Sequence, residues 1–435
     1  MPRVLPLALA CCVLAQPAAE AAPLAVERSK RPEARPVALD RSLRPVARPS
    51  TMSAPTETER RVRPPAFDRW IDRFRIRARA SGIRDDVLEA AFAGIAYERD
   101  VIAKDRNQAE FTRTIWQYLG SAVSDSRVEN GRAALARHRG LLERLEADYG
   151  VPAEIVTAVW GMESAYGTFR GETDVIGALA TLAHDGRRGA FFEDQLIAAL
   201  RILQAGDVAP RDMTGSWAGA MGHTQFIPTS FLAYAVDGDG DGRRDIWSDD
   251  PTDALASTAA YLDRHGWVRG QPWGVEVILP DGFDYTLTGK GVTRSPRDWA
   301  ALGVRGADGQ VVPDHGEASI LLPGGAEGAA FMIFRNFHVI ARYNAADAYV
   351  IGVGHLADRI AGGPPIRSGW PDDARALRVA ERRELQSRLT RAGFDTRGID
   401  GRIGPNTIAA IRAYQRSAGL TPDGYASLAL LERLR

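Results

Sequence analysis

Apolar residues at helical spacing are the feature that most constrains the fold of this chain. Phe67, Trp70, Ile71 and Phe74 fall at i, i+3, i+4 and i+7, so they line one face of a helix that packs on a core. The same kind of pattern recurs at 87–92, 111–119, 141–149, 337–340 and 348–360. The sequence therefore predicts a mainly helical protein.

The residue pattern is different in one region, between about 268 and 335. β-prone runs at 275–278 and 319–322 are separated by Gly and Pro pairs, which favour turns. We expect a small sheet inserted among the helices, which makes the fold class mainly α with an α+β character.

The first 21 residues have the order of parts found in a secretory signal peptide. Arg3 precedes an apolar run from Val4 to Ala15, and Ala19-Glu20-Ala21 is suited to cleavage. We expect an exported, periplasmic protein. Lipid anchoring through Cys11 or Cys12 is less favoured, because the apolar run before them is short.

Both cysteines lie inside this signal, so the mature chain is expected to contain no thiol and no disulfide. No later stretch reaches the roughly 20 apolar residues that a membrane span needs, and we expect no transmembrane segment. The 55 basic residues balance the 55 acidic ones, which gives no electrostatic reason to expect nucleic acid as a partner.

Two segments are predicted to be linkers. Residues 22–65 are rich in Pro and Arg and poor in large apolar groups, so they cannot bury enough surface to offset the entropy of ordering. Residues 361–375 contain a second cluster of Gly and Pro. This leaves a main domain at 66–360 and a smaller unit at 376–435.

Glu163 is the first candidate for chemistry. A helix is expected from Pro152, a good first-turn residue, through strongly apolar sequence to Trp160-Gly161-Met162-Glu163. Burial there would destabilise the carboxylate and raise its pKa, as an acid catalyst requires. The alternative is an ordinary solvated helical glutamate.

A second cluster at 215–230 crowds small residues around an amide and several hydroxyls. Small residues allow a ligand or a backbone to approach closely, and Ser216 and Gln225 can hydrogen-bond to a sugar. The alternative is a tightly packed turn.

Together these segments resemble the membrane-bound B type of lytic transglycosylase, whose catalytic domain is lysozyme-like. The resemblance covers about 67–360. It is carried by Glu110-Phe111-Thr112 with Trp116 and Tyr118, by Glu163-Ser164-Ala165-Tyr166-Gly167, by Gly219-Ala220-Met221-Gly222, by Gln225-Phe226-Ile227-Pro228, and by Arg342-Tyr343-Asn344. The resemblance implies that Glu163 is the catalytic acid and base. It also implies that the sugar is bound by Tyr118, Ser216, Gln225, Tyr343 and Asn344.

The implied substrate is the glycan strand of peptidoglycan, cut between N-acetylmuramic acid and N-acetylglucosamine. Most glycosidases use two carboxylates. In this family one glutamate protonates the glycosidic oxygen and then takes a proton from the muramyl C6 hydroxyl, which closes a 1,6-anhydro ring without water. The chemistry itself needs no cofactor.

An aspartate-rich loop suggests a structural Ca²⁺ site. Asp237, Asp239 and Asp241 stand at positions one, three and five of a pattern with glycine at six, as in an EF-hand. Arg243 would add its backbone carbonyl. By resemblance the closing ligand would be Asp253, and the alternative is a solvated acidic turn.

The C-terminal unit resembles the common peptidoglycan-binding domain of three short helices. Its motifs are Leu385 to Leu389, Asp400 to Thr407 and Gly419 to Gly424. We expect a monomer. Two other functions stay open at this stage, a hydrolytic muramidase and a wall-binding scaffold without activity.

Overall fold

The computed structural model describes residues 63–106, 113–372 and 375–435. The expected signal peptide, nearly all of the first linker and the Glu110-Phe111-Thr112 motif lie outside the described residues. The helices are α2 (Pro65–Ala80), α3 (Asp85–Phe92), α4 (Arg99–Arg106), α5 (Ile115–Ala122), α6 (Asp125–Arg137), α7 (Arg139–Tyr149), α8 (Ala153–Ser164), α9 (Val175–Asp185), α10 (Gly189–Ala205), α11 (Pro228–Tyr234), α12 (Thr252–Arg264), α13 (Pro296–Ala301), α14 (Arg335–Tyr343), α15 (Asp347–Ile360), α16 (Val379–Arg391), α17 (Pro405–Ser417) and α18 (Leu428–Leu434). The strands are β1 (Thr173–Asp174), β2 (Thr214–Gly215), β3 (Gly274–Ile278), β4 (Arg305–Gly306), β5 (Ser319–Leu321) and β6 (Ala330–Ile333).

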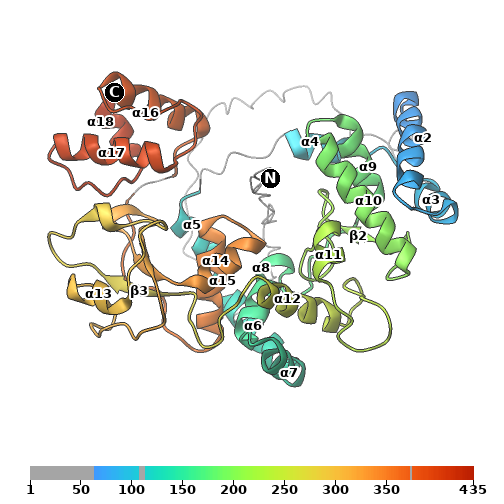
Figure 1. Ribbon diagram of the computed structural model, residues 1–435, viewed down its shortest axis with the longest axis horizontal. Coiled ribbons are helices and arrows are strands. Elements are labelled where there is room, and N and C mark those ends of the chain that lie inside the picture. The colour runs from blue at the N-terminus through green and yellow to red at the C-terminus, as the bar shows by residue number, and fades with distance from the viewer. Residues whose placement is uncertain (1–62, 107–112, 373–374) are drawn as a thin grey trace, which may run out of the picture.

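Helix α8 lies at the centre of the main domain (Figure 1) and packs against α6, α7, α12 and α15. It is apolar almost all round, so nearly every residue from Ala153 to Met162 is buried. A helix surrounded in this way is held by its neighbours rather than by one amphipathic face. The expected helix is therefore present, although it begins at Ala153, and Pro152 is its N-cap.

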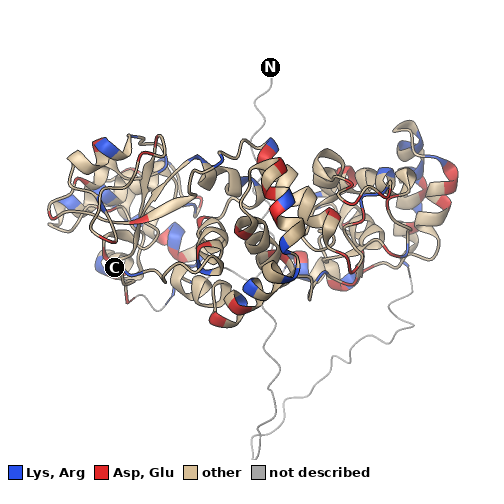
Figure 2. Ribbon diagram, turned by 90° about the horizontal axis from the view of Figure 1, so that it is seen from below, with Lys and Arg blue, Asp and Glu red and all other residues tan. Residues whose placement is uncertain are grey.

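A second group of helices flanks this core. Helices α9 and α10 pack on each other, and α2, α3 and α4 pack against them. An ion cluster helps to fix α4, because the buried carboxylate of Asp105 accepts hydrogen bonds from Arg187 and Arg188 at 2.5 Å. This group lies on the right in Figure 1, and blue and red positions are scattered over the described ribbon in Figure 2.

The inserted sheet is antiparallel and has the strand order β4-β3-β6-β5. It forms a small core of its own around Trp299, which is fully buried and donates from its indole nitrogen to the carbonyl of Ala318 at 2.9 Å. The expected sheet region is thus confirmed. A two-stranded pair, β1 with β2, was not anticipated by the sequence pattern.

Helices α16, α17 and α18 form the three-helix unit expected at the C-terminus, with a core of its own around Leu385, Leu389 and Ile411. The segment that leads to it lies against the main domain. The Glu276 carboxylate accepts from the amides of Arg367 and Ser368, and Trp370 stacks on Trp116 with ring centroids 5.7 Å apart.

The mainly helical fold with its inserted sheet and three-helix C-terminal unit is confirmed. Among the described residues, none of the helices is long and apolar enough to cross a bilayer.

Close packing of α15 generates a prediction. A Cβ on Gly354 of α15 would lie 2.3 Å from the Trp273 ring, whereas one on Gly120 of α5 would meet nothing within 4 Å. Gly354→Ala should lower the free energy of unfolding by about 1–3 kcal/mol through overpacking. The control Gly120→Ala should raise it by about 0.5–1 kcal/mol, because alanine favours the helix. Urea denaturation measures both, and equal effects would contradict the packing.

Candidate active site

Glu163 is the penultimate residue of α8, and the C-cap residue Ala165 follows the helix in a left-handed conformation with φ +48°. Its carboxyl group is partly shielded by the core that surrounds the helix. Burial raises the pKa of Glu163 to about 7, while a hydrogen bond from Tyr349 opposes this shift. The negative end of the helix dipole also disfavours the carboxylate. The residue is therefore suited to hold a proton near neutral pH.

Three tyrosines from separate helices converge on this glutamate. The Tyr349 hydroxyl on α15 donates to Glu163 Oε1 at 2.5 Å. Burial raises the pKa values of Tyr349, Tyr118 on α5 and Tyr343 at the end of α14, and the negative charge of Glu163 raises all three further. The structure thus brings the expected Tyr118 and Tyr343 to the candidate acid.

Tyr349 was missed by the sequence reasoning. It is 2% exposed and lies 186 residues after Glu163, so no local spacing connects the two. Its place in the first turn of α15, six residues after the Tyr343 motif residue, was the one available signal.

Gln225 lies at φ +56°, and its side chain holds the neighbouring loops. Its amide nitrogen donates to the carbonyls of Arg170 and Gly222, both at 2.9 Å. Both amide hydrogens are therefore engaged, and the side-chain carbonyl is the group that can accept from a ligand. Ser216 Oγ accepts from the Ala220 amide at 3.1 Å and keeps its own hydrogen to donate.

Tyr343 and Asn344 form the turn between α14 and α15. The Tyr343 hydroxyl donates to the carbonyl of Thr224 at 2.6 Å, which joins this turn to the Gln225 loop. Asn344 is 8% exposed, and its Oδ1 accepts from the amide of Ala346 at 3.0 Å. Its oxygen thus holds the residue that directly precedes α15, the helix on which Tyr349 lies.

The small residues of the second cluster serve close backbone packing. A Cβ on Gly222, at φ +69°, would lie 2.2 Å from the carbonyl oxygen of Ile246. A Cβ on Gly219, at φ +85°, would lie 2.6 Å from Leu179. The tightly packed turn therefore exists, and it holds Ser216 and Gln225 in place.

His223 connects this cluster to the end of α8, a role that the sequence did not indicate. Its carbonyl accepts from Ser164 Oγ at 2.5 Å, and Ser164 follows the glutamate directly. Its ring nitrogen Nδ1 accepts from Trp160 Nε1 at 3.1 Å. The hydrogen on the ring then belongs to Nε2, which donates to the carbonyl of Ser248 at 2.7 Å.

Burial lowers the pKa of His223, in keeping with a neutral ring. Arg170 strengthens the same contact, since its guanidinium donates to Ser248 at 2.6 Å and pairs with Asp249 at 2.7 Å. Segment 246–249 follows the acidic loop in the chain. The end of α8 is thereby joined through His223 to the segment that follows that loop.

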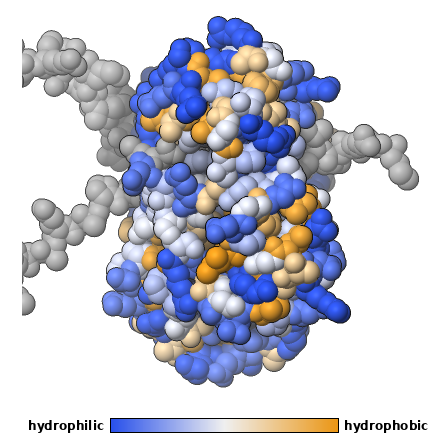
Figure 3. Space-filling model, turned by 90° about the vertical axis from the view of Figure 1, so that its left-hand side faces the viewer, coloured by the Kyte–Doolittle hydropathy of each residue, from blue (hydrophilic) through white to orange (hydrophobic). Residues whose placement is uncertain are grey.

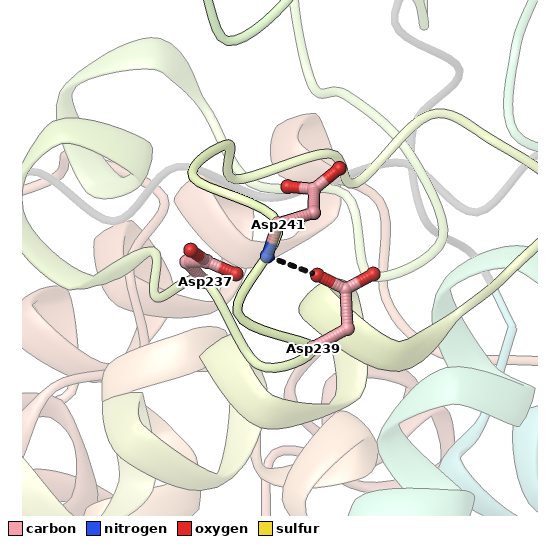
Figure 4. A group of neighbouring side chains, drawn as sticks. All are labelled: Asp237, Asp239 and Asp241. Atoms are coloured by element: carbon pink, nitrogen blue, oxygen red, sulfur yellow. Dashed lines mark hydrogen bonds between the residues drawn. The ribbon is translucent and has the colours of Figure 1, made fainter.

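The acidic loop brings the three predicted aspartates together. One carboxylate oxygen each from Asp237, Asp239 and Asp241 lies within 4.8 Å of the other two, and all three residues are exposed (Figure 4). The loop is shaped by backbone amides, because Gly240 and Gly242 both donate to Asp237. Two oxygens on one Ca²⁺ lie at most about 5 Å apart, so these three fit such an ion.

Asp253 and Arg243 occupy different positions around this loop. Asp253 is 3% exposed, and its two oxygens accept from the amides of Gly238 at 2.7 Å and Asp245 at 2.6 Å. Burial, together with the neighbouring aspartates, raises the pKa of Asp253 to about 6. The amide of Arg243 donates to Asp241 at 2.8 Å, which leaves its carbonyl as the group that could face an ion.

The buried acid leads to a prediction on stability. The folded protein keeps the proton of Glu163 up to about pH 7, whereas the unfolded chain loses it near 4.5. Stability is therefore lost as pH rises through this window. Glu163→Gln cannot ionise and should exceed the wild type by about 1–3 kcal/mol at pH 8 but not at pH 4. Chemical denaturation at both pH values tests this, and an equal gain at both would contradict it.

Comparison with known proteins agrees with this geometry. Residues 66–358 match the family model of the transglycosylase SLT domain, and residues 378–434 match that of a putative peptidoglycan-binding domain. The membrane-bound lytic murein transglycosylase B of Escherichia coli is 33% identical over 254 residues, which are 56% of this chain and 67% of the relative.

Solved structures match over most of the chain. SltB3 from Pseudomonas aeruginosa, in complex with NAG-anhNAM-pentapeptide, is 49% identical with a TM-score of 0.83, and the match covers 86% of this chain and all of SltB3. Escherichia coli Slt35 in complex with calcium is 30% identical with a TM-score of 0.57, covering 71% of this chain and 98% of Slt35. The chain therefore belongs to the transglycosylase SLT domain family and is a lytic transglycosylase with a C-terminal peptidoglycan-binding domain.

Proposed function

We propose that this enzyme cleaves the β-1,4 bond between N-acetylmuramic acid and N-acetylglucosamine of peptidoglycan and leaves 1,6-anhydromuramic acid ends. The observation that carries the proposal is the carboxyl group of Glu163, whose pKa burial raises to about 7. No other carboxylate in the described chain contributes to that shift. A site with one carboxylate suits a reaction in which the substrate supplies its own nucleophile.

The hydrogen bond from Tyr349 suggests which oxygen carries the proton. Because Oε1 of Glu163 accepts from the tyrosine hydroxyl, the transferable proton belongs on Oε2. That proton passes to the glycosidic oxygen as the bond to the muramyl C1 breaks, and N-acetylglucosamine leaves with a free 4-hydroxyl group.

The second step returns the proton. The muramyl C6 hydroxyl attacks C1 of the same sugar, its oxygen forms the new bond, and its proton moves to the Glu163 carboxylate. The attacking group is already held on the substrate, so no second molecule has to be bound and oriented. Tyr349 stabilises the carboxylate between the two steps, because its hydroxyl donates to the charged form.

The expected ligand groups support this substrate. Gln225 offers a carbonyl, Ser216 offers a hydroxyl and Tyr118 offers an aromatic surface, which together suit an N-acetylated sugar. SltB3 of Pseudomonas aeruginosa binds NAG-NAM-pentapeptide, a fragment of this kind. The signal-like first 21 residues support an exported, periplasmic location.

Digestion of purified sacculi tests the proposal. Wild type should release fragments with anhydro ends, which are lighter than reducing ends by one water. Glu163→Gln should lower the rate by about 10³-fold or more, because the acid and base are both lost. Mass spectrometry of the products measures this, and reducing ends alone would show a hydrolase instead.

The control for this experiment is Glu154→Gln, in the first turn of the same helix. It should digest sacculi like the wild type. Equal, negligible product from all three proteins would indicate a wall-binding protein without activity.

We also propose that the acidic loop holds a structural Ca²⁺. Its ligands would be the carboxylates of Asp237, Asp239 and Asp241 and the backbone carbonyl of Arg243. Asp253 would be a further ligand if one of its carboxylate oxygens exchanged the amide of Gly238 for the ion. Slt35, a relative of 30% identity, has been crystallised with calcium. The ion would hold the loop closed, and the reaction would not pass through it.

Removing the ion should lower the thermal stability of the protein more than it lowers the rate of the reaction. At 2 mM Ca²⁺ the melting temperature should exceed that in EDTA by several degrees. The increase should grow with the logarithm of the Ca²⁺ concentration, because the ion binds only the folded protein. Asp239→Asn should abolish the difference, and Asp281→Asn, an exposed aspartate elsewhere, should keep it. A melting temperature that is the same in Ca²⁺ and in EDTA would contradict the site.

A further inference from the structure

The C-terminal domain is docked on the inserted sheet through side chains of its own. The Asp423 carboxylate accepts from the amide of Ala326 at 2.8 Å. Arg412 on α17 donates from Nη2 to Thr288 Oγ1 at 2.7 Å. The C-terminal helices lie directly above the sheet in Figure 1, and the same side faces the viewer in Figure 3. The two parts therefore meet at a defined junction.

A hollow of about 350 Å³ lies at this junction. Its walls come from three parts of the chain, namely residues 113–115 before and in α5, the sheet turns at 288–289 and 321–323, and the C-terminal domain. This volume is within the range of sites that bind small molecules. None of the catalytic residues described above lines it, whereas Ile403, Asp423 and Gly424 from the motifs of the C-terminal domain do.

The charges around the hollow favour an anion. Arg113, Arg382 and Arg412 line it, against one carboxylate, Asp423. That carboxylate is already engaged, since it accepts from Ala326 and also from Gln415 at 2.7 Å. The excess of guanidinium groups is therefore not neutralised within the hollow.

Arg412 lines the hollow and has a buried donor without an acceptor in the described part of the chain. Its Nε is buried and has no hydrogen-bond acceptor among the described residues. A buried guanidinium nitrogen without an acceptor costs free energy, which an incoming carboxylate would recover. Burial lowers the pKa of Arg412, as expected for a cation that has lost water without gaining a full set of partners.

Much of the rest of the wall is apolar. Ile115, Leu321, Leu377 and Ile408 are among the side chains that line it. A ligand that fits both features carries a carboxylate next to small apolar groups. The alanine end of a peptidoglycan stem peptide has this chemistry, a terminal carboxylate beside methyl groups.

We propose that the hollow between the sheet and the C-terminal domain binds the carboxylate end of a stem peptide, with Arg412 as its main donor. This inference rests on the proposed function, because it assumes a peptidoglycan substrate. Binding there would place the peptide of one sugar unit at a fixed distance from Glu163, so that the C-terminal domain and the sheet recognise the strand together.

Calorimetry with the inactive full chain Glu163→Gln tests the proposal. Three probes are compared, namely GlcNAc-MurNAc-pentapeptide, the same compound with a C-terminal carboxamide, and GlcNAc-MurNAc without peptide. The acid should bind about tenfold or more tightly than the carboxamide, because the charge-assisted hydrogen bonds are lost with the charge.

Arg412→Gln, added to this chain, should remove the preference for the acid and leave binding of the peptide-free probe unchanged. Arg382→Gln keeps the contact between Arg412 and Thr288 and should reduce the preference about threefold. Arg416→Gln, exposed one turn further along α17, is the matched control and should behave like the parent. Small-angle scattering shows whether the domains stay docked.

Two results would overturn the inference. One is equal affinity for the acid and the carboxamide, and the other is a preference that survives in both Arg412→Gln and Arg382→Gln. If wild type still releases anhydro ends from sacculi, such results reject only the peptide site. If wild type releases none, the proposed function itself fails, whatever the probes show.

Discussion

The burial of one carboxyl group at the end of α8 is the constraint on which the rest of the site depends. Glu163 can store a proton near neutral pH only because α8 is packed on all sides, so the helix that carries the acid is also the centre of the core. This burial costs stability when the group ionises. This loss of stability occurs at the position where the reaction needs a neutral acid.

Long-range hydrogen bonds fix the position of that acid. Tyr349 reaches Glu163 from α15, and His223 ties the residue after Glu163 to the loop that follows the acidic cluster. These contacts join the end of α8 to segment 246–249, which follows the aspartate loop in the chain.

Much of the fold and part of the site could be predicted from local sequence. Helical spacing identified α2 at Phe67 and α15 before Ile360, and alternating Gly and β-prone runs identified the inserted sheet. The pair β1 and β2 was missed, because strands of two residues carry no periodic signal. Tyr349 and the tautomer of His223 were also missed, since both depend on partners far away in the chain.

The sequence by itself determined which segments become helices, where the acid stands and which aspartates share a loop, because these properties depend on residues only a few positions apart. Only the tertiary structure decided which tyrosines surround Glu163, that both amide hydrogens of Gln225 hold loops together, and that Arg412 is left with a buried nitrogen at a domain junction. These outcomes depend on burial and on hydrogen bonds between distant segments, which exist only after the chain has packed.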